Sequence, residues 1–190
     1  MSSHNTRTSL LIRIKDPRNT QAWAEFHDLY APLLYRYARA RGLSHDDAED
    51  VRSTCYEAIV KQIPHFDYDS QRGGFKAWLQ TLVSRRVIDL MRKRQYLTMD
   101  SGRLVEVPAV DATADQIWEE HWRKQHLRHC MEQAGLYVSQ QSYQAFRLLV
   151  EEQCSVSDIC ERLGMNANQV YKAKAQMLAT IRELMQASED

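Results

Sequence analysis

The chain has 190 residues, of which 44% are hydrophobic, and its 25 basic and 25 acidic residues give a formal net charge of zero. No apolar run approaches the roughly 20 residues that a membrane-spanning helix needs, and the polar N-terminus lacks the apolar core of a signal peptide. We therefore expect a cytoplasmic globular protein of one or two domains, in which the scattered cysteines are free thiols: Cys55, Cys130, Cys154 and Cys160.

The charges are unevenly distributed along this neutral chain. Residues 46–50 are acidic, residues 72–94 are basic with Asp89 as the one acid among them, and residues 100–120 are acidic again. Opposed blocks of charge indicate separate surfaces for separate partners. The alternative explanation is that the charges simply lie on solvated helix faces. This alternative is stronger for the acidic blocks than for the basic block.

Two helices are predicted in the first third of the chain. Apolar residues recur at helical spacing over residues 20–41, and Gly42 ends this pattern. Ser44 is placed to cap a second helix, with Asp47 at the capping-box position, and Pro64 stops it. A loop with two aromatic residues then leads to the basic block.

The basic block itself predicts a third helix over residues 75–94, in which Trp78 is a core residue because it shares a face with Leu82. Periodicity fails over residues 96–114, which carry a glycine, a proline and several acids, so this segment is interpreted as a flexible acidic linker. Helical patterns resume near Asp115 and again after Ser139.

The chain closes with the pattern of a helix-turn-helix. Ser155 and Asp158 have capping-box spacing, Gly164 stands where a left-handed residue ends the short first helix, and Asn166 can cap the second. The apolar stripe of the second helix is Val170, Ala173, Met177, Ile181 and Leu184.

The side chains near the start of that second helix have the chemistry of a DNA-reading surface. Amides can reach base edges, and lysines neutralise phosphates. The predicted set is Asn168, Gln169, Tyr171, Lys172 and Lys174. A solvated face of an ordinary helical bundle is the alternative, because any such bundle can contain a short helix, a glycine turn and a long helix.

Three strings, in this order, carry a resemblance to a known family: LSHDDAEDVRSTCYEAIV, FDYDSQRGGFKAWLQTLVSRRVIDLMRKR and the terminal helix-turn-helix. The chain resembles bacterial extracytoplasmic-function (ECF) sigma factors, the small two-domain members of the RNA polymerase sigma family. The resemblance covers residues from about 23 to 184. It likens the strings to the helix that docks on the polymerase clamp, the element that recognises and melts minus-ten DNA, and the minus-thirty-five reader.

The resemblance implies an all-α protein of two small helical domains, a region-two-like bundle and a helix-turn-helix region-four-like domain. Residues 9–95 would bind the polymerase clamp and the minus-ten promoter element, residues 96–114 would be the linker, and residues 115–190 would bind the minus-thirty-five element. The implied function is to bind core RNA polymerase, at its clamp and flap, and to direct initiation by recognising and melting promoter DNA.

The implied contact residues fall into two sets. A polymerase-binding set occupies the second predicted helix, whose acids can meet a basic coiled coil: Asp47, Glu49, Asp50, Ser53 and Thr54. A minus-ten set combines aromatic faces that can stack on bases with cations that can follow phosphates: Phe66, Tyr68, Lys76, Arg85, Arg86, Arg92 and Lys93. Phe66 is also a candidate for packing rather than stacking.

The chain departs from the family pattern at two places. Ser53 and Thr54 stand where members often carry a glutamine and an acid, which puts the detailed clamp contacts in question. Arg85 stands where many members have asparagine, which shifts this position towards phosphate binding.

Two other functions are compatible with the same sequence. The runner-up is a helix-turn-helix transcription regulator that acts without core polymerase, and a third is an interaction adaptor in which the helix-turn-helix is only a fold. No phosphate-binding loop or nucleophile motif is present, so we expect no enzyme activity and no cofactor. His126 and Cys130 have the spacing of a metal pair but lack a complementary pair, so no metal is expected. The resemblance also raises an anti-sigma protein as a partner. The charges of the chain itself offer an alternative, in which the acidic linker masks the basic helix.

Overall fold

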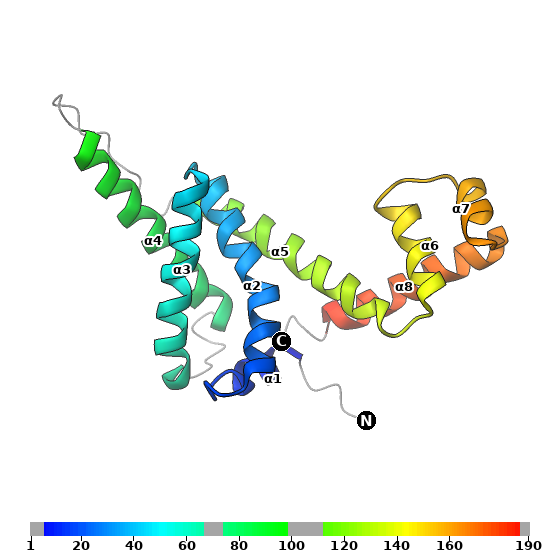
Figure 1. Cartoon of the computed structure of the whole chain (residues 1–190), viewed down its shortest axis with the longest axis horizontal. Helices are drawn as coiled ribbons and strands as arrows, with labels where there is room; N and C mark the ends of the chain where they lie inside the picture. Colours follow the sequence, from blue (N-terminus) through cyan, green and yellow to red (C-terminus); the bar gives the residue numbers. More distant parts are fainter. Residues whose placement is uncertain (1–5, 67–73, 99–111, 187–190) are drawn as a thin grey trace. The chain divides into compact units, whose positions relative to one another are not determined.

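The computed structural model describes residues 6–66, 74–98 and 112–186, and every regular element in these ranges is helical. This confirms the all-α prediction. The described residues divide into two compact units, one formed by Thr8–Gln125 and the other by residues 126–186 together with Thr6 and Arg7. Figure 1 shows the helices of each unit.

The first unit is built on a bundle of three long helices. It contains α1 (Thr6–Arg13), α2 (Thr20–Ala40), α3 (His45–Gln62), the 3-10 turn η1 (Ile63–His65), α4 (Gly74–Thr98) and the first half of α5 (Ala112–Gly135). Helix α3 packs against both α2 and α4 (Figure 1). The short helix α1 was not predicted, yet its residues Leu10 and Leu11 and the following Ile14 are buried in the same core.

Side-chain caps and a glycine define the ends of α2 and the start of α3. The side chain of Asn19 accepts a hydrogen bond from Ala22 N at 3.1 Å, which satisfies one of the free amides at the start of α2. Gly42 adopts φ +88°, a conformation that costs glycine little, and lets the chain turn from α2 into α3. Ser44 caps α3 as predicted, and its Oγ accepts from Asp47 N.

Aromatic rings fill the centre of the first unit. Phe26, Tyr30 and Tyr37 of α2 are completely buried, and so is Trp118 of α5. The Tyr37 and Trp118 rings meet edge to face, with their centroids 5.4 Å apart. Such pairs add to the free energy gained from burying their apolar surface.

The second domain was expected to begin at Asp115 after a linker over residues 96–114, and the structure divides the chain differently. Helix α4 extends to Thr98, and α5 begins at Ala112. Residues 112–125 belong to the first unit, because Trp118 and Trp122 are part of its core. The remainder of the expected linker, residues 99–111, lies outside the described residues.

The second unit is formed by the second half of α5 with α6 (Gln140–Val150), α7 (Val156–Leu163) and α8 (Ala167–Gln186). Helix α8 packs against α6 and α7, which also contact each other. One buried cluster joins α5, α6 and α8 around Phe146 and Met177, and a second joins α6, α7 and α8 around Ile159 and Val170. None of the described helices of either unit is long and apolar enough to cross a bilayer.

Candidate nucleic-acid and polymerase interfaces

The helix-turn-helix has the predicted caps. Ser155 Oγ accepts a hydrogen bond from Asp158 N at 3.1 Å, and Gly164 ends α7 with φ +64°. A Cβ at position 164 would meet no heavy atom within 4 Å, so the backbone conformation is the reason for glycine here. The short turn between α7 and α8 therefore has a fixed geometry.

A reciprocal capping box fixes the start of α8. Asn166 Oδ1 accepts from Gln169 N at 2.9 Å, and Gln169 Oε1 accepts from Asn166 N at 2.8 Å. Each side chain thus satisfies a backbone amide of the other residue. Gln169 was predicted as a base reader, but its side-chain oxygen is occupied in holding the helix terminus.

The other predicted residues of the recognition helix are exposed. Asn168 and Lys172 are one turn apart on the side of α8 opposite the buried stripe, and Tyr171, whose side chain is 56% exposed, is next to Lys172. Lys174 follows Val170 by one turn, so it flanks the buried stripe instead of joining this face. Asn168, Tyr171 and Lys172 form the group that can face a groove.

The cations of α4 are divided among three directions. Arg85 and Arg92 are exposed and two turns apart, so they share one side of the helix. Arg86 and Lys93, also exposed, form a second row about 100° away. Lys76 is apart from both rows, since its Nζ lies 2.6 Å from Glu119 Oε2 on α5.

The aromatic residues of the predicted minus-ten set divide as well. Phe66 is half-buried and packs against the core, with its ring centroid 6.0 Å from that of Phe75 and 5.0 Å from that of Trp78. Trp78 is likewise packed against the core, in agreement with the sequence prediction. Tyr68 lies outside the described residues.

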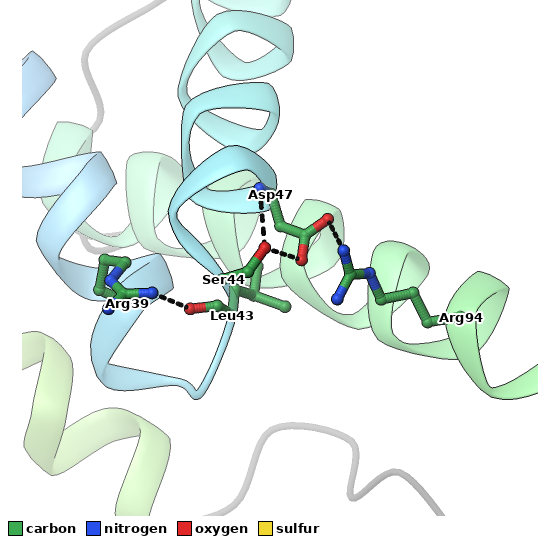
Figure 2. Close-up of polar contacts among 5 residues, drawn as sticks. All are labelled: Arg39, Leu43, Ser44, Asp47 and Arg94. Carbon is green, nitrogen blue, oxygen red and sulfur yellow. Dashed lines mark hydrogen bonds and ion pairs between the residues drawn. The ribbon is translucent and has the colours of Figure 1, made fainter. Parts of the chain in front are cut away.

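Asp47 differs from the other acids of α3 because it is buried, with 5% of its surface exposed. Its Oδ2 accepts a hydrogen bond from Ser44 Oγ at 2.6 Å, and its Oδ1 lies 2.6 Å from Arg94 Nη2 (Figure 2). Arg39 donates to the Leu43 carbonyl oxygen beside this site. Asp47, predicted to bind polymerase, is therefore engaged within the first unit.

The remaining predicted residues of α3 are more accessible. Asp50, Ser53 and Thr54 are exposed, although the Thr54 hydroxyl donates to the Asp50 carbonyl oxygen at 2.9 Å. Glu49 is half-buried and forms an ion pair with Arg52.

Comparison with known proteins shows what this arrangement resembles. Residues 26–96, which run from α2 into α4, match the sigma-70 region 2 family. The ECF RNA polymerase sigma factor SigE of Mycolicibacterium smegmatis is 25% identical over 121 residues, which cover 63% of this chain and 46% of that protein. The ECF RNA polymerase sigma factor BldN of Streptomyces coelicolor is 22% identical over 184 residues, 96% of this chain and 67% of BldN.

Residues 26–96 of the chain thus match sigma-70 region 2, and the chain is similar to two ECF RNA polymerase sigma factors. The alignment spans about half the length of SigE, and the family match over residues 26–96 includes every residue of both predicted contact sets of the first unit.

Sequence reasoning missed part of the exposed face of α3. Asp46, Glu57 and Val60 are exposed and lie on the same side of the helix as Ser53. The buried stripe of Val51, Cys55 and Ile59, visible in the sequence, was enough to place them there. Val60, 46% exposed, gives this acidic face an apolar end.

Two residues with the spacing of a metal pair occupy packed positions. His126 and Cys130 are buried on α5, with 4% and 3% of their surfaces exposed. Among the described residues, no three potential ligands are grouped so that they could hold a metal ion. Burial raises the pKa of the Cys55 thiol to about 12, against the opposing effect of the Arg86 charge.

Proposed function

We propose that the chain binds core RNA polymerase and directs it to specific promoters, recognising and melting promoter DNA. The observation that carries this proposal is that the region 2 match covers one domain with an acidic α3 face and exposed arginine rows on α4. Two surfaces of opposite charge on one bundle suit a protein partner and a nucleic acid at the same time.

The acidic face of α3 is proposed to contact the polymerase clamp. It comprises Asp46, Glu49, Asp50, Ser53, Thr54 and Glu57, with Val60 at its end. Complementary potentials on the two partners raise the association rate and fix the register. Asp47 supports this face from within by capping α3.

The two cation rows of α4 are proposed to follow the phosphates of the minus-ten region. Arg85 with Arg92, and Arg86 with Lys93, can each contact successive phosphates. Phe66 and Tyr68 remain candidates for base stacking. To stack on a base, the Phe66 ring would have to give up its contacts with the Phe75 and Trp78 rings.

The start of α8 is proposed to enter the major groove of the minus-thirty-five element. Asn168 reads base edges there, Tyr171 offers an apolar contact, and Lys172 and Lys174 bind phosphates. The same unit is proposed to contact the polymerase flap. The chain has no chemical step of its own in this mechanism, because polymerase supplies the catalysis.

Reconstitution tests the proposal. The purified chain, mixed with core polymerase and a library of promoter fragments, is expected to bind core and to initiate from a specific subset. A chain that binds duplex DNA but neither binds core nor directs initiation would instead be the polymerase-independent regulator. A chain that binds neither would be an interaction adaptor.

An anti-sigma protein is proposed as the regulatory partner, since a protein covering the α3 face and the α4 rows would block both contacts together. Adding such a partner to the reconstituted reaction is expected to lower core binding and DNA binding in parallel. If the partner lowered only core binding or only DNA binding, the proposal that one protein covers both the α3 face and the α4 rows would be contradicted.

A further inference from the structure

The first half of α5, residues 112–125, lies against α4 within the first unit, and we call it the α5 strap. Gln80 Nε2 donates to Asp115 Oδ1 at 2.7 Å, and Lys76 Nζ lies 2.6 Å from Glu119 Oε2. One turn forward along α4 thus corresponds to one turn back along α5. The α5 strap therefore runs antiparallel to α4, and its acidic residues Asp115 and Glu119 contact that helix.

Apolar contacts hold the same segment. Trp118 is fully buried against Tyr37, and Trp122, 6% exposed, has its ring centroid 5.9 Å from that of Tyr30. Lys76 Nζ lies 5.7 Å from the Trp122 ring centroid, a cation–π distance. The strap is therefore a packed part of the first unit.

This contact changes what α4 offers to DNA. Lys76 is the one proposed phosphate contact that the described residues neutralise, since Arg85, Arg86, Arg92 and Lys93 form no ion pair within them. A phosphate and the Glu119 carboxylate would compete for the same ammonium group. The Glu119 carboxylate of the strap therefore takes the place of a phosphate at Lys76, near the start of α4.

The strap also determines how the two units are joined. While it is packed, residues 99–111 connect two helices of the same unit, and the first unit continues into the second through α5 itself. If it is released, residues 99–125 become the connection and can extend to roughly 90 Å. Promoter elements about 25 base pairs apart, as their names imply, are separated by roughly 85 Å of duplex.

We propose that the α5 strap holds the free chain in a closed state and is released when the chain engages polymerase and promoter. The release step rests on the proposed function, whereas the closed state does not. The acids that contact α4 in this state include Asp115 and Glu119.

The closed state is tested on the free chain with Glu119→Lys and the matched control Glu120→Lys. Both change the charge equally, but Glu120 pairs with Lys124 on its own helix and Glu119 with Lys76 on α4. Hydrogen exchange over residues 112–125 is expected to be roughly three- to tenfold faster in Glu119→Lys than in the control. The affinity for a fluorescent 20-nucleotide single strand of DNA is also expected to rise more in Glu119→Lys than in Glu120→Lys.

A charge swap provides the rescue. Lys76→Glu combined with Glu119→Lys is expected to return strap exchange to the wild-type rate, because the ion pair is restored with its signs reversed. If Glu119→Lys exchanges no faster than Glu120→Lys, or if the swap fails to restore slow exchange in a chain with wild-type unfolding temperature, the closed state is refuted.

Release is tested by hydrogen exchange in the complex with core polymerase and promoter DNA. Residues 112–125 are expected to lose protection there, and protection equal to that of the free chain would overturn the release step. Failure to bind core at all would refute the proposed function, while the free-chain measurements would still decide whether the strap is closed.

Discussion

Asp47 at the start of α3 and Arg94 near the end of α4 form an ion pair of 2.6 Å between residues that are distant in sequence. The carboxylate is buried and also accepts the Ser44 hydroxyl, whereas the guanidinium side chain is 54% exposed (Figure 2). The pair links the start of the helix with the acidic face to the far end of the basic helix. It identifies Asp47 as a structural residue.

Arg94→Ala is expected to destabilise the first unit by about 1 kcal/mol, because Asp47 loses its cation while partly exposed pairs contribute modestly. Arg92→Ala is the control, since Arg92 is exposed and forms no ion pair among the described residues. Urea unfolding followed by tryptophan fluorescence measures this unit alone, because Trp23, Trp78, Trp118 and Trp122 all lie in it. Equal midpoints for the two variants would show that the pair contributes nothing.

Gln169→Ala is expected to lower the stability of the second unit by about 1 kcal/mol, because it removes one half of the capping box. Gln169→Glu keeps an acceptor at the same place and is expected to retain wild-type stability. Thermal unfolding by circular dichroism measures both. A Gln169→Ala variant as stable as wild type would contradict the capping role.

Asn168→Ala is expected to leave stability unchanged and to relax selectivity at one upstream base pair by about 1–3 kcal/mol. Lys174→Ala is expected instead to weaken all promoters alike, because phosphate contacts carry no sequence information. Competition among promoter variants differing at single positions separates these effects. If both substitutions lowered the affinity for all promoters by the same factor, the placement of α8 in the major groove would be wrong.

Arg85→Ala combined with Arg86→Ala takes one cation from each row of α4. Open-complex formation is expected to weaken, and the slope of log affinity against log salt to fall by roughly 1.5, since each lost phosphate contact contributes about 0.7–0.9. Arg123→Ala with Lys124→Ala removes the same charge from α5 and serves as control. Normal promoter opening by a folded double-arginine variant would reject the assignment.

Iodoacetamide at pH 8 is expected to label Cys154 and Cys160, which are partly exposed, and to spare Cys55 and Cys130, which are buried. The raised pKa of Cys55 leaves almost no thiolate at that pH, and thiolate is the reactive form. Peptide mass spectrometry in buffer and in urea distinguishes the cysteines. Rapid native labelling of Cys55 would contradict its burial.

The local signals of the sequence were sufficient for most helices. Ser44, Ser155 and Gly164 mark helix ends through chemistry that operates within a few residues, so these ends could be read directly. The helix α1 escaped because eight residues give too little periodicity, although Leu10 and Ile14 are buried. Its stability comes from tertiary packing, which a single sequence does not display.

The candidate site was predictable in composition but less so in geometry. The cations of α4 and the amides of α8 were identified by type, whereas the burial of Asp47 depends on Arg94, far along the chain. The role of Lys76 likewise depends on Glu119. Trp118 and Trp122 stand in an acidic helix beyond a non-periodic segment, so nothing local assigns them to the first core.

The position of Trp118 and Trp122 has a consequence for protein engineering. A chimaera of two related proteins is usually joined within an apparent linker, which here is residues 99–111. With that junction, Trp118 and Trp122 would come from one parent and would have to pack against Tyr30 and Tyr37 from the other. A junction after Gln125, with the phase of α5 preserved, keeps each core with its own parent. If the proposed function holds, the exchangeable segment for changing promoter choice therefore begins inside a helix.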